Sequence, residues 1–114
     1  MSVITSINQA LAAAGFTPGG VGSVHGPPGE EHITITPDYD DFPVEADNNP
    51  LIDAQHADVH FFMLGDYRAR IKLAVSAFLA QGLIIEDRRY IEMEEEFKLH
   101  HYVISVTKKE VWED

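Results

Sequence analysis

Six histidines are the residues of this sequence best suited to metal chemistry, because neutral imidazole is a common ligand of zinc and iron. His56 and His60 fall on one face of an expected strand, and His100 and His101 are adjacent on another. Four residues of strand rise would separate His56 from His60 by about 13 Å, which is too far for both to bind one ion. The spacing is therefore weakly specific, and we expect neither a metal nor another cofactor.

Two groups of acidic residues could supply carboxylates for catalysis or cation binding. They are Asp38, Asp40 and Asp41, and Glu92, Glu94, Glu95 and Glu96. The aspartates lack the glycine and the distal glutamate of an EF-hand at the required offsets, so they predict a solvated turn. General acid catalysis needs a desolvated carboxyl with a raised pKa, whereas a hydrated acidic run is typical of a hairpin end or of a surface that meets a partner. The glutamates therefore favour an assembly surface over a catalytic site.

The glycine- and proline-rich stretch at about residues 17–31 predicts a flexible loop rather than a nucleotide site. A phosphate-binding loop needs a preceding strand and a lysine that leads into a helix, and this stretch has no lysine. Ser23 and His25 could be assembled with an aspartate into a hydrolase triad, but the stretch has no nucleophile elbow. We expect no catalytic residue and no enzymatic activity.

The element that positions the rest of the chain is an expected helix from Asp66 to Gly82. Asp66 is a favourable N-cap, and Gly82 suits the left-handed residue that follows a helix. Apolar residues recur between them with helical spacing at Tyr67, Ile71, Ala74, Val75, Phe78 and Leu79. Such a stripe must be buried, so we expect this helix to lie on a sheet.

The flanking segments predict a second helix and four strands. The expected elements are a helix over Ser2–Ala14 and strands over His32–Thr36, Gln55–Leu64, Leu83–Met93 with an irregular start, and Leu99–Lys108. Pro37 is expected to end the first strand, and the last two strands should form an antiparallel hairpin. The fold class is therefore α+β, in the order α-β-β-α-β-β, with a mostly antiparallel four-stranded sheet packed against helices.

Length and charge narrow the function classes. A chain of 114 residues is expected to form a single domain over 1–114. Eight basic residues against 19 acidic ones give a net charge of −11, which argues against binding nucleic acid. The absence of cysteine excludes disulfides and thiolate metal sites. Without a basic leader or a long apolar run, the sequence predicts a soluble cytoplasmic protein that does not contact a membrane.

The pattern over about residues 32–108 resembles the tail-terminator, or tail-completion and head–tail joining, proteins of long-tailed bacteriophages and prophages. The segments that carry the resemblance are Ala46-Asp47-Asn48 before a strand, the strand Gln55–Leu64, Gly65-Asp66-Tyr67 opening the helix, Ala80-Gln81-Gly82 closing it, and Tyr90-x-x-x-Glu94-Glu95 followed by Lys98-Leu99-His100-His101-Tyr102. The order and spacing of these segments carry more weight than any one of them.

The resemblance implies a structural virion protein of the phage tail, assembled in the bacterial host cytoplasm. Its partners would be further copies of itself in a ring of six subunits, the tail tube protein and the head–tail connector. The ring would cap the tube, stop its growth and let DNA pass through the lumen without specific binding. The two acidic groups, Asp38 to Asp41 and Glu92 to Glu96, would then lie at assembly or lumen surfaces.

Two other function classes remain open from the sequence. One is an acidic binding or inhibitor module that masks a basic surface on its partner, and the other is a small metal-dependent enzyme that uses the histidines. Metal analysis of the purified protein separates the second class, because a structural protein should hold no stoichiometric zinc or iron.

Overall fold

The computed structural model describes residues 1–17, 19–21, 30–41 and 52–111. Its elements are α1 (Val3–Ala13), β1 (Gly20–Val21), β2 (His32–Asp41), β3 (Ile52–Met63), α2 (Tyr67–Ala80), β4 (Ile84–Glu94) and β5 (Leu99–Val111). Apart from the two-residue β1, this is the predicted order of two helices and four strands. The α+β fold class is confirmed. Neither of these helices is long and apolar enough to cross a membrane.

The strands form one sheet in the order β1-β2-β3-β5-β4. The four long strands are antiparallel to their neighbours, as predicted, while β1 pairs in parallel with β2. In β3 and β5, alternating residues face opposite sides of the sheet. The predicted partition of Gln55–Leu64, with Ala57, Val59, Phe61 and Met63 on the buried side, is confirmed.

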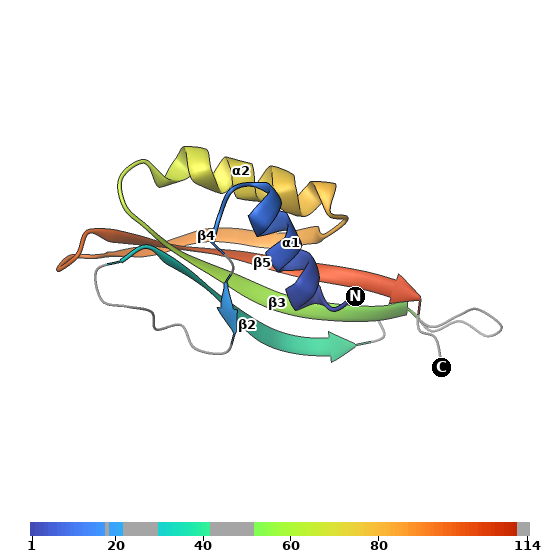
Figure 1. Ribbon diagram of the computed structural model, residues 1–114. Coiled ribbons are helices and arrows are strands. Elements are labelled where there is room, and N and C mark those ends of the chain that lie inside the picture. The colour runs from blue at the N-terminus through green and yellow to red at the C-terminus, as the bar shows by residue number, and fades with distance from the viewer. Residues whose placement is uncertain (18, 22–29, 42–51, 112–114) are drawn as a thin grey trace.

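Both helices lie on the same face of the sheet, and the hydrophobic core fills the space between them (Figure 1). α1 contributes Ile7 and Leu11, and the strands contribute Phe61 and Ile104, all fully buried. Phe78 of α2 is also fully buried and lies 6.4 Å from Phe61 between ring centroids. This face corresponds to the apolar side predicted for the strands, so the other face of the sheet carries the polar side.

The short strand β1 was not predicted, because a segment rich in glycine and proline gives no strand signal. The side-chain oxygen of Asn8 accepts a hydrogen bond of 2.9 Å from the Gly19 N–H. A Cβ atom at Gly19 would lie 2.9 Å from Cγ1 of Ile35, so glycine permits this close approach to β2. The expectation of an irregular loop over 17–31 is therefore wrong at Gly20–Val21, while residues 18 and 22–29 lie outside the described part of the chain.

The prediction that Pro37 ends its strand is also wrong. β2 continues to Asp41, with an irregularity in its pairing between Pro37 and Asp40. β1 pairs only with Thr34 and Ile35, so Pro37 lies on a part of β2 that pairs with a described strand on one side only. Proline is tolerated at such an edge or bulge. The aspartates expected in a turn therefore belong to the strand.

The ends of α2 lie where the sequence predicts them, but the predicted capping hydrogen bond is missing at the N-terminal end. Asp66 occupies the N-cap position, yet its side chain makes no capping hydrogen bond. Instead, the N–H of Tyr67 donates to the carbonyl of Gly65 at 3.0 Å. Gly82 has a φ of +83° and follows the helix as predicted.

In the predicted apolar stripe, Ile71, Ala74 and Phe78 are buried. Leu79 is 57% exposed, and its inclusion was wrong, because it faces away from the sheet.

The predicted hairpin of the last two strands is confirmed. β4 and β5 pair from Ile84 opposite Thr107 to Glu94 opposite Leu99, and Glu95 to Lys98 form the turn. Lys98 has a φ of +57° in this turn. β4 agrees with the predicted strand within one residue at each end, and β5 is longer than predicted because it continues past Lys108 to Val111. In Figure 1 the turn lies at the end of the molecule, beyond the N-terminal end of α2.

Candidate interaction surfaces

The face of the sheet opposite the helices, called here the open face, carries a set of paired polar side chains. Residues directly opposite each other on antiparallel strands share a face, and the open-face pairs of β3 and β5 are His56 with Thr107, Asp58 with Ser105, His60 with Val103, and Phe62 with His101. The Ser105 hydroxyl donates to Asp58 at 2.6 Å, and the Thr107 hydroxyl lies 2.8 Å from Nδ1 of His56. These bonds link the two central strands across a polar surface.

One end of the open face carries stacked aromatic and imidazole rings. Phe62 stacks between His32 and His101, with ring centroids 4.3 Å apart on each side. Nδ1 of His60 lies 2.9 Å from Nε2 of His101, so one ring donates an N–H to the other. Partial burial lowers the pKa of His101 to about 4, with smaller contributions from His60, Arg89 and His32. Burial also lowers the pKa of His60, against the opposing effect of Asp58. Both imidazoles are therefore neutral at pH 7.

The histidines do not assemble into a metal site in the described part of the chain. There, no group of three or more histidine, aspartate or glutamate side chains is placed to hold a metal ion. His56 and His60 bind different partners, because Nε2 of His56 lies 2.8 Å from Asp41 while His60 contacts His101. His100 lies on the helix-facing side, where its Nδ1 is 2.9 Å from the Tyr90 hydroxyl. The pairing of His60 with His101, 41 residues apart in sequence, depends on strand register alone.

The two predicted acidic surfaces are exposed but lie far apart. Asp41 pairs with Ala54, whereas Glu92 faces His101, which pairs with Phe62. The eight residues of β3 from Ala54 to Phe62 correspond to about 26 Å of strand. The structure therefore separates these acids into two surfaces at opposite ends of the sheet.

Each acidic group has its own surroundings. Asp38 lines a depression of about 210 Å³ on the open face together with Asp58 and Glu86. Asp40 is exposed on β2.

Glu92 and Glu94 are exposed on β4, and Glu95 and Glu96 are exposed in the turn. Among these glutamates, Glu95 is 3.2 Å from Lys98. Exposed pairs of this kind contribute little to stability, which leaves the turn a strongly anionic tip.

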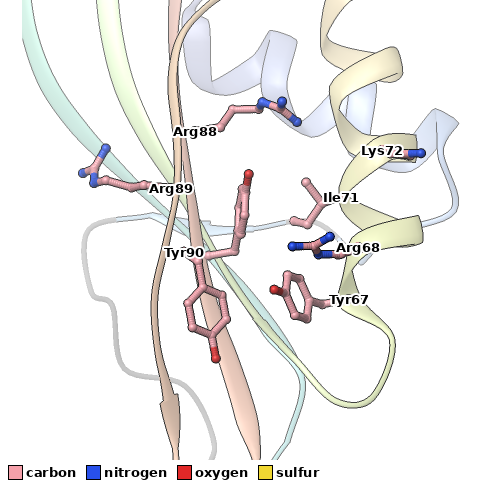
Figure 2. A pocket seen from close by; sticks show the side chains of 8 residues that line it. Tyr67, Arg68, Ile71, Lys72, Arg88, Arg89 and Tyr90 are labelled. Atoms are coloured by element: carbon pink, nitrogen blue, oxygen red, sulfur yellow. The ribbon is translucent and has the colours of Figure 1, made fainter.

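A cleft between α2 and the β4–β5 hairpin was not predicted. This cleft, called here the tyrosine cleft, has a volume of about 390 Å³. Figure 2 shows side chains of α2 facing those of β4 across it. Its aromatic lining is Tyr67, Tyr90 and Tyr102, and the ring centroid of Tyr67 lies 5.4 Å from that of Tyr90 and 6.1 Å from that of Tyr102.

The tyrosine cleft also collects positive charge. Four basic residues border it, and one of them, Arg89, points away from α2 (Figure 2) and pairs with Asp87 at 2.6 Å. The other three are Arg68 and Lys72 from α2 and Arg88 from β4. They are three of the eight basic residues in a chain of net charge −11. All three are exposed, and none forms an ion pair with another described residue. Partial desolvation, followed by Tyr67, Glu95 and Glu92, raises the pKa of Tyr90, so its hydroxyl stays protonated. The cleft can therefore bind anionic groups through cations and phenol donors.

The only sequence signal for this cleft is the spacing of Arg68 and Lys72, which are four residues apart and therefore on one side of α2. Nothing local connects them with Arg88 and Tyr90, because pairing of the hairpin with β3 brings these elements together. Three sequence candidates cannot be placed at all. Ser23, His25 and the Ala46-Asp47-Asn48 segment lie outside the described residues.

Comparisons with known proteins do not assign this chain to a family. No protein-family model matches the chain, and no curated protein matches it.

Proposed function

We propose that this chain is a tail-terminator protein of a long-tailed phage or prophage. Copies of the chain form a ring of six subunits that caps the finished tail tube, stops its growth and joins the tail to the head. The proposal rests on the order and spacing of the quoted segments over about residues 32–108. The partners are further copies of the chain, the tail tube protein and the head–tail connector.

The observation that best supports an assembly role is the exposed edge of the sheet at β4. This strand has 11 residues, almost all of them exposed, and among the described strands it pairs with β5 alone. An edge strand of this length presents a row of unpaired backbone N–H and C=O groups to a neighbouring molecule. Monomeric proteins usually shorten, cover or charge such edges. β4 carries six charged side chains but is neither short nor covered by another described strand, and this length supports a subunit that is completed by neighbours.

The charge distribution suits a passage for DNA. Acidic side chains at a lumen repel the phosphate backbone, so DNA would pass without adhering to the ring. Asp38 to Asp41 and Glu92 to Glu96 remain the candidates for assembly or lumen surfaces, and their separation of about 26 Å along the sheet means that they face different surroundings in a ring.

The test is deletion of the gene from the phage that encodes it, followed by electron microscopy of the particles. We expect tails of irregular length that are not joined to heads, and a plasmid copy of the wild-type gene should restore normal particles. Tails of normal length that remain attached to heads would overturn the proposal.

A further inference from the structure

The tyrosine cleft and the end of the β4–β5 hairpin are two surfaces of opposite charge on the same molecule. The hairpin end carries three consecutive acids, called here the acidic tip: Glu94, the last residue of β4, and Glu95 and Glu96 of the turn. The side chain of Glu95 is 80% exposed. The cleft presents Arg68, Lys72 and Arg88 beside three tyrosines. Opposite charges on two surfaces of one molecule favour contact between copies.

The dimensions of the two surfaces agree. Arg68 and Lys72 are four residues apart on α2, which corresponds to about 6 Å along the helix axis. Glu94 and Glu96 are two residues apart, which corresponds to at most about 7 Å of chain. Two carboxylates of the tip can therefore meet the two helix cations at the same time. Arg88 on the facing strand is available to a third carboxylate.

A tip cannot enter the cleft of its own molecule. Arg88 and Glu94 are six residues apart on β4, which places them about 20 Å apart along the strand. Pairing of β4 with β5 extends to Glu94 opposite Leu99, with one irregularity between Tyr90 and Glu92, so the strand stays in the sheet up to the turn. The tip also lies beyond the N-terminal end of α2 (Figure 1). The occupant of the cleft must therefore come from another molecule.

We propose that the tyrosine cleft of one copy binds the acidic tip of a second copy of this chain. This inference rests on the proposed ring and names the contact that would build it. Because the donor and acceptor surfaces are different patches, the interface is heterologous, and repetition of such a contact closes a ring when its rotation divides a full turn.

Disulfide trapping tests the contact directly, because the natural sequence has no cysteine and gives no background. Two single-cysteine variants, Glu95→Cys in the tip and Lys72→Cys in the cleft, are mixed under a mild oxidant, with one of them carrying a size tag. We expect a disulfide-linked heterodimer at a yield at least fivefold above that of a control mixture. The control combines Glu95→Cys with Lys109→Cys, an exposed lysine of β5 outside the cleft.

Charge reversal in the cleft supplies the second readout. Adding Arg68→Glu and Arg88→Glu to the Lys72→Cys variant should lower the heterodimer to the control yield, and circular dichroism checks that every variant is folded. A chain that carries both Glu95→Cys and Lys72→Cys should give a ladder of covalent oligomers. Equal heterodimer yields in the test and control mixtures would overturn the inference, including the case in which the cleft binds an acidic segment of another protein.

The trapping experiment and the gene deletion fail independently. A specific tip–cleft disulfide together with normal tails in the deletion strain would reject the terminator function and keep the contact. Irregular tails together with non-specific disulfides would reject the contact and keep the function.

Discussion

Phe78 and Leu79 are consecutive apolar residues of α2 with opposite surroundings. Phe78 is fully buried against Phe61, whereas Leu79 is 57% exposed. Phe78→Ala should lower the free energy of unfolding by about 3–5 kcal/mol, through lost burial and the cavity that remains. Leu79→Ala is the matched control and should change it by less than about 0.5 kcal/mol. Urea unfolding of the purified variants measures both, and similar losses would contradict the position of α2 on the sheet.

His101 links stability to pH. Its pKa is about 4 in the folded chain, below the ordinary value of 6.5, mainly because of burial. Between these values the unfolded chain binds a proton that the folded chain does not, so stability is complete above about pH 6.5 and falls as the pH drops toward 4. The charged or titratable groups around His101 are His60, His32 and Arg89, with Asp58 beside His60, and Glu92 is opposite it on β4.

His101→Gln tests this dependence. The glutamine cannot take up this proton. The unfolding free energy of wild type should therefore fall relative to that of the variant as the pH drops from about 6.5 to 4. Denaturant unfolding at several pH values measures the difference, and NMR of the imidazole C2–H should give a titration midpoint well below 6.5 in the wild type. A midpoint near 6.5, with a difference that does not depend on pH, would contradict the buried stack.

At the scale of elements, the end of α2 depends on one backbone conformation. Gly82 has a φ of +83°, and a Cβ atom there would meet no atom within 4 Å. Gly82→Ala should therefore cost about 1–2 kcal/mol through backbone strain alone. Gly20→Ala is the control, because its Cβ is equally unobstructed and its φ is not positive. Thermal unfolding should shift for Gly82→Ala only, and an equal shift in both variants would contradict this account.

The strands differ in how completely they are paired. β3 and β5 have a hydrogen-bonded neighbour on each side, whereas β4 has only β5 within residues 1–17, 19–21, 30–41 and 52–111. In the free protein we expect the slowest amide exchange in β3 and β5, for example at Val59 and Ile104, approaching the free energy of global unfolding. About half of the β4 amides should exchange much faster, because they point outward. Mass spectrometry or NMR measures this, and uniform protection along β4 would show that its edge is covered.

At the scale of the whole molecule, the hydrophobic core and the proposed interaction surfaces lie in different places. The core lies on the helix-facing side of the sheet, while the acidic tip, the tyrosine cleft and the edge of β4 are at the surface. The three cations of the cleft are a local exception in a chain of net charge −11. Screening by salt should weaken contacts through that cleft, because they involve exposed charges.

Local patterns predicted the two helices, the four long strands and most of their buried faces. Helical spacing places Ile71 and Phe78 on the buried side of α2, and strict alternation assigns Phe61 to the core and His60 to the opposite face. These are properties of neighbouring residues, since backbone geometry sets the period of each element. Two local predictions were wrong because neighbouring elements were not considered. Pro37 does not end β2, since it lies on an edge part of that strand, and the glycine-rich segment forms β1, since Gly19 allows a close approach to Ile35.

Tertiary structure decided which distant residues meet. The strand order β2-β3-β5-β4 and its register bring His60 to His101 and separate Asp41 from Glu92, and none of these relations can be read from spacing along the chain. The tyrosine cleft likewise requires Arg68 of α2 and Arg88 of β4 to face each other. The sequence by itself determined the α+β class and the acidic character of the surface, because both follow from residue type and local period. The pairing of strands that are far apart in sequence determined the sites, because only the assembled sheet fixes the distances between their side chains.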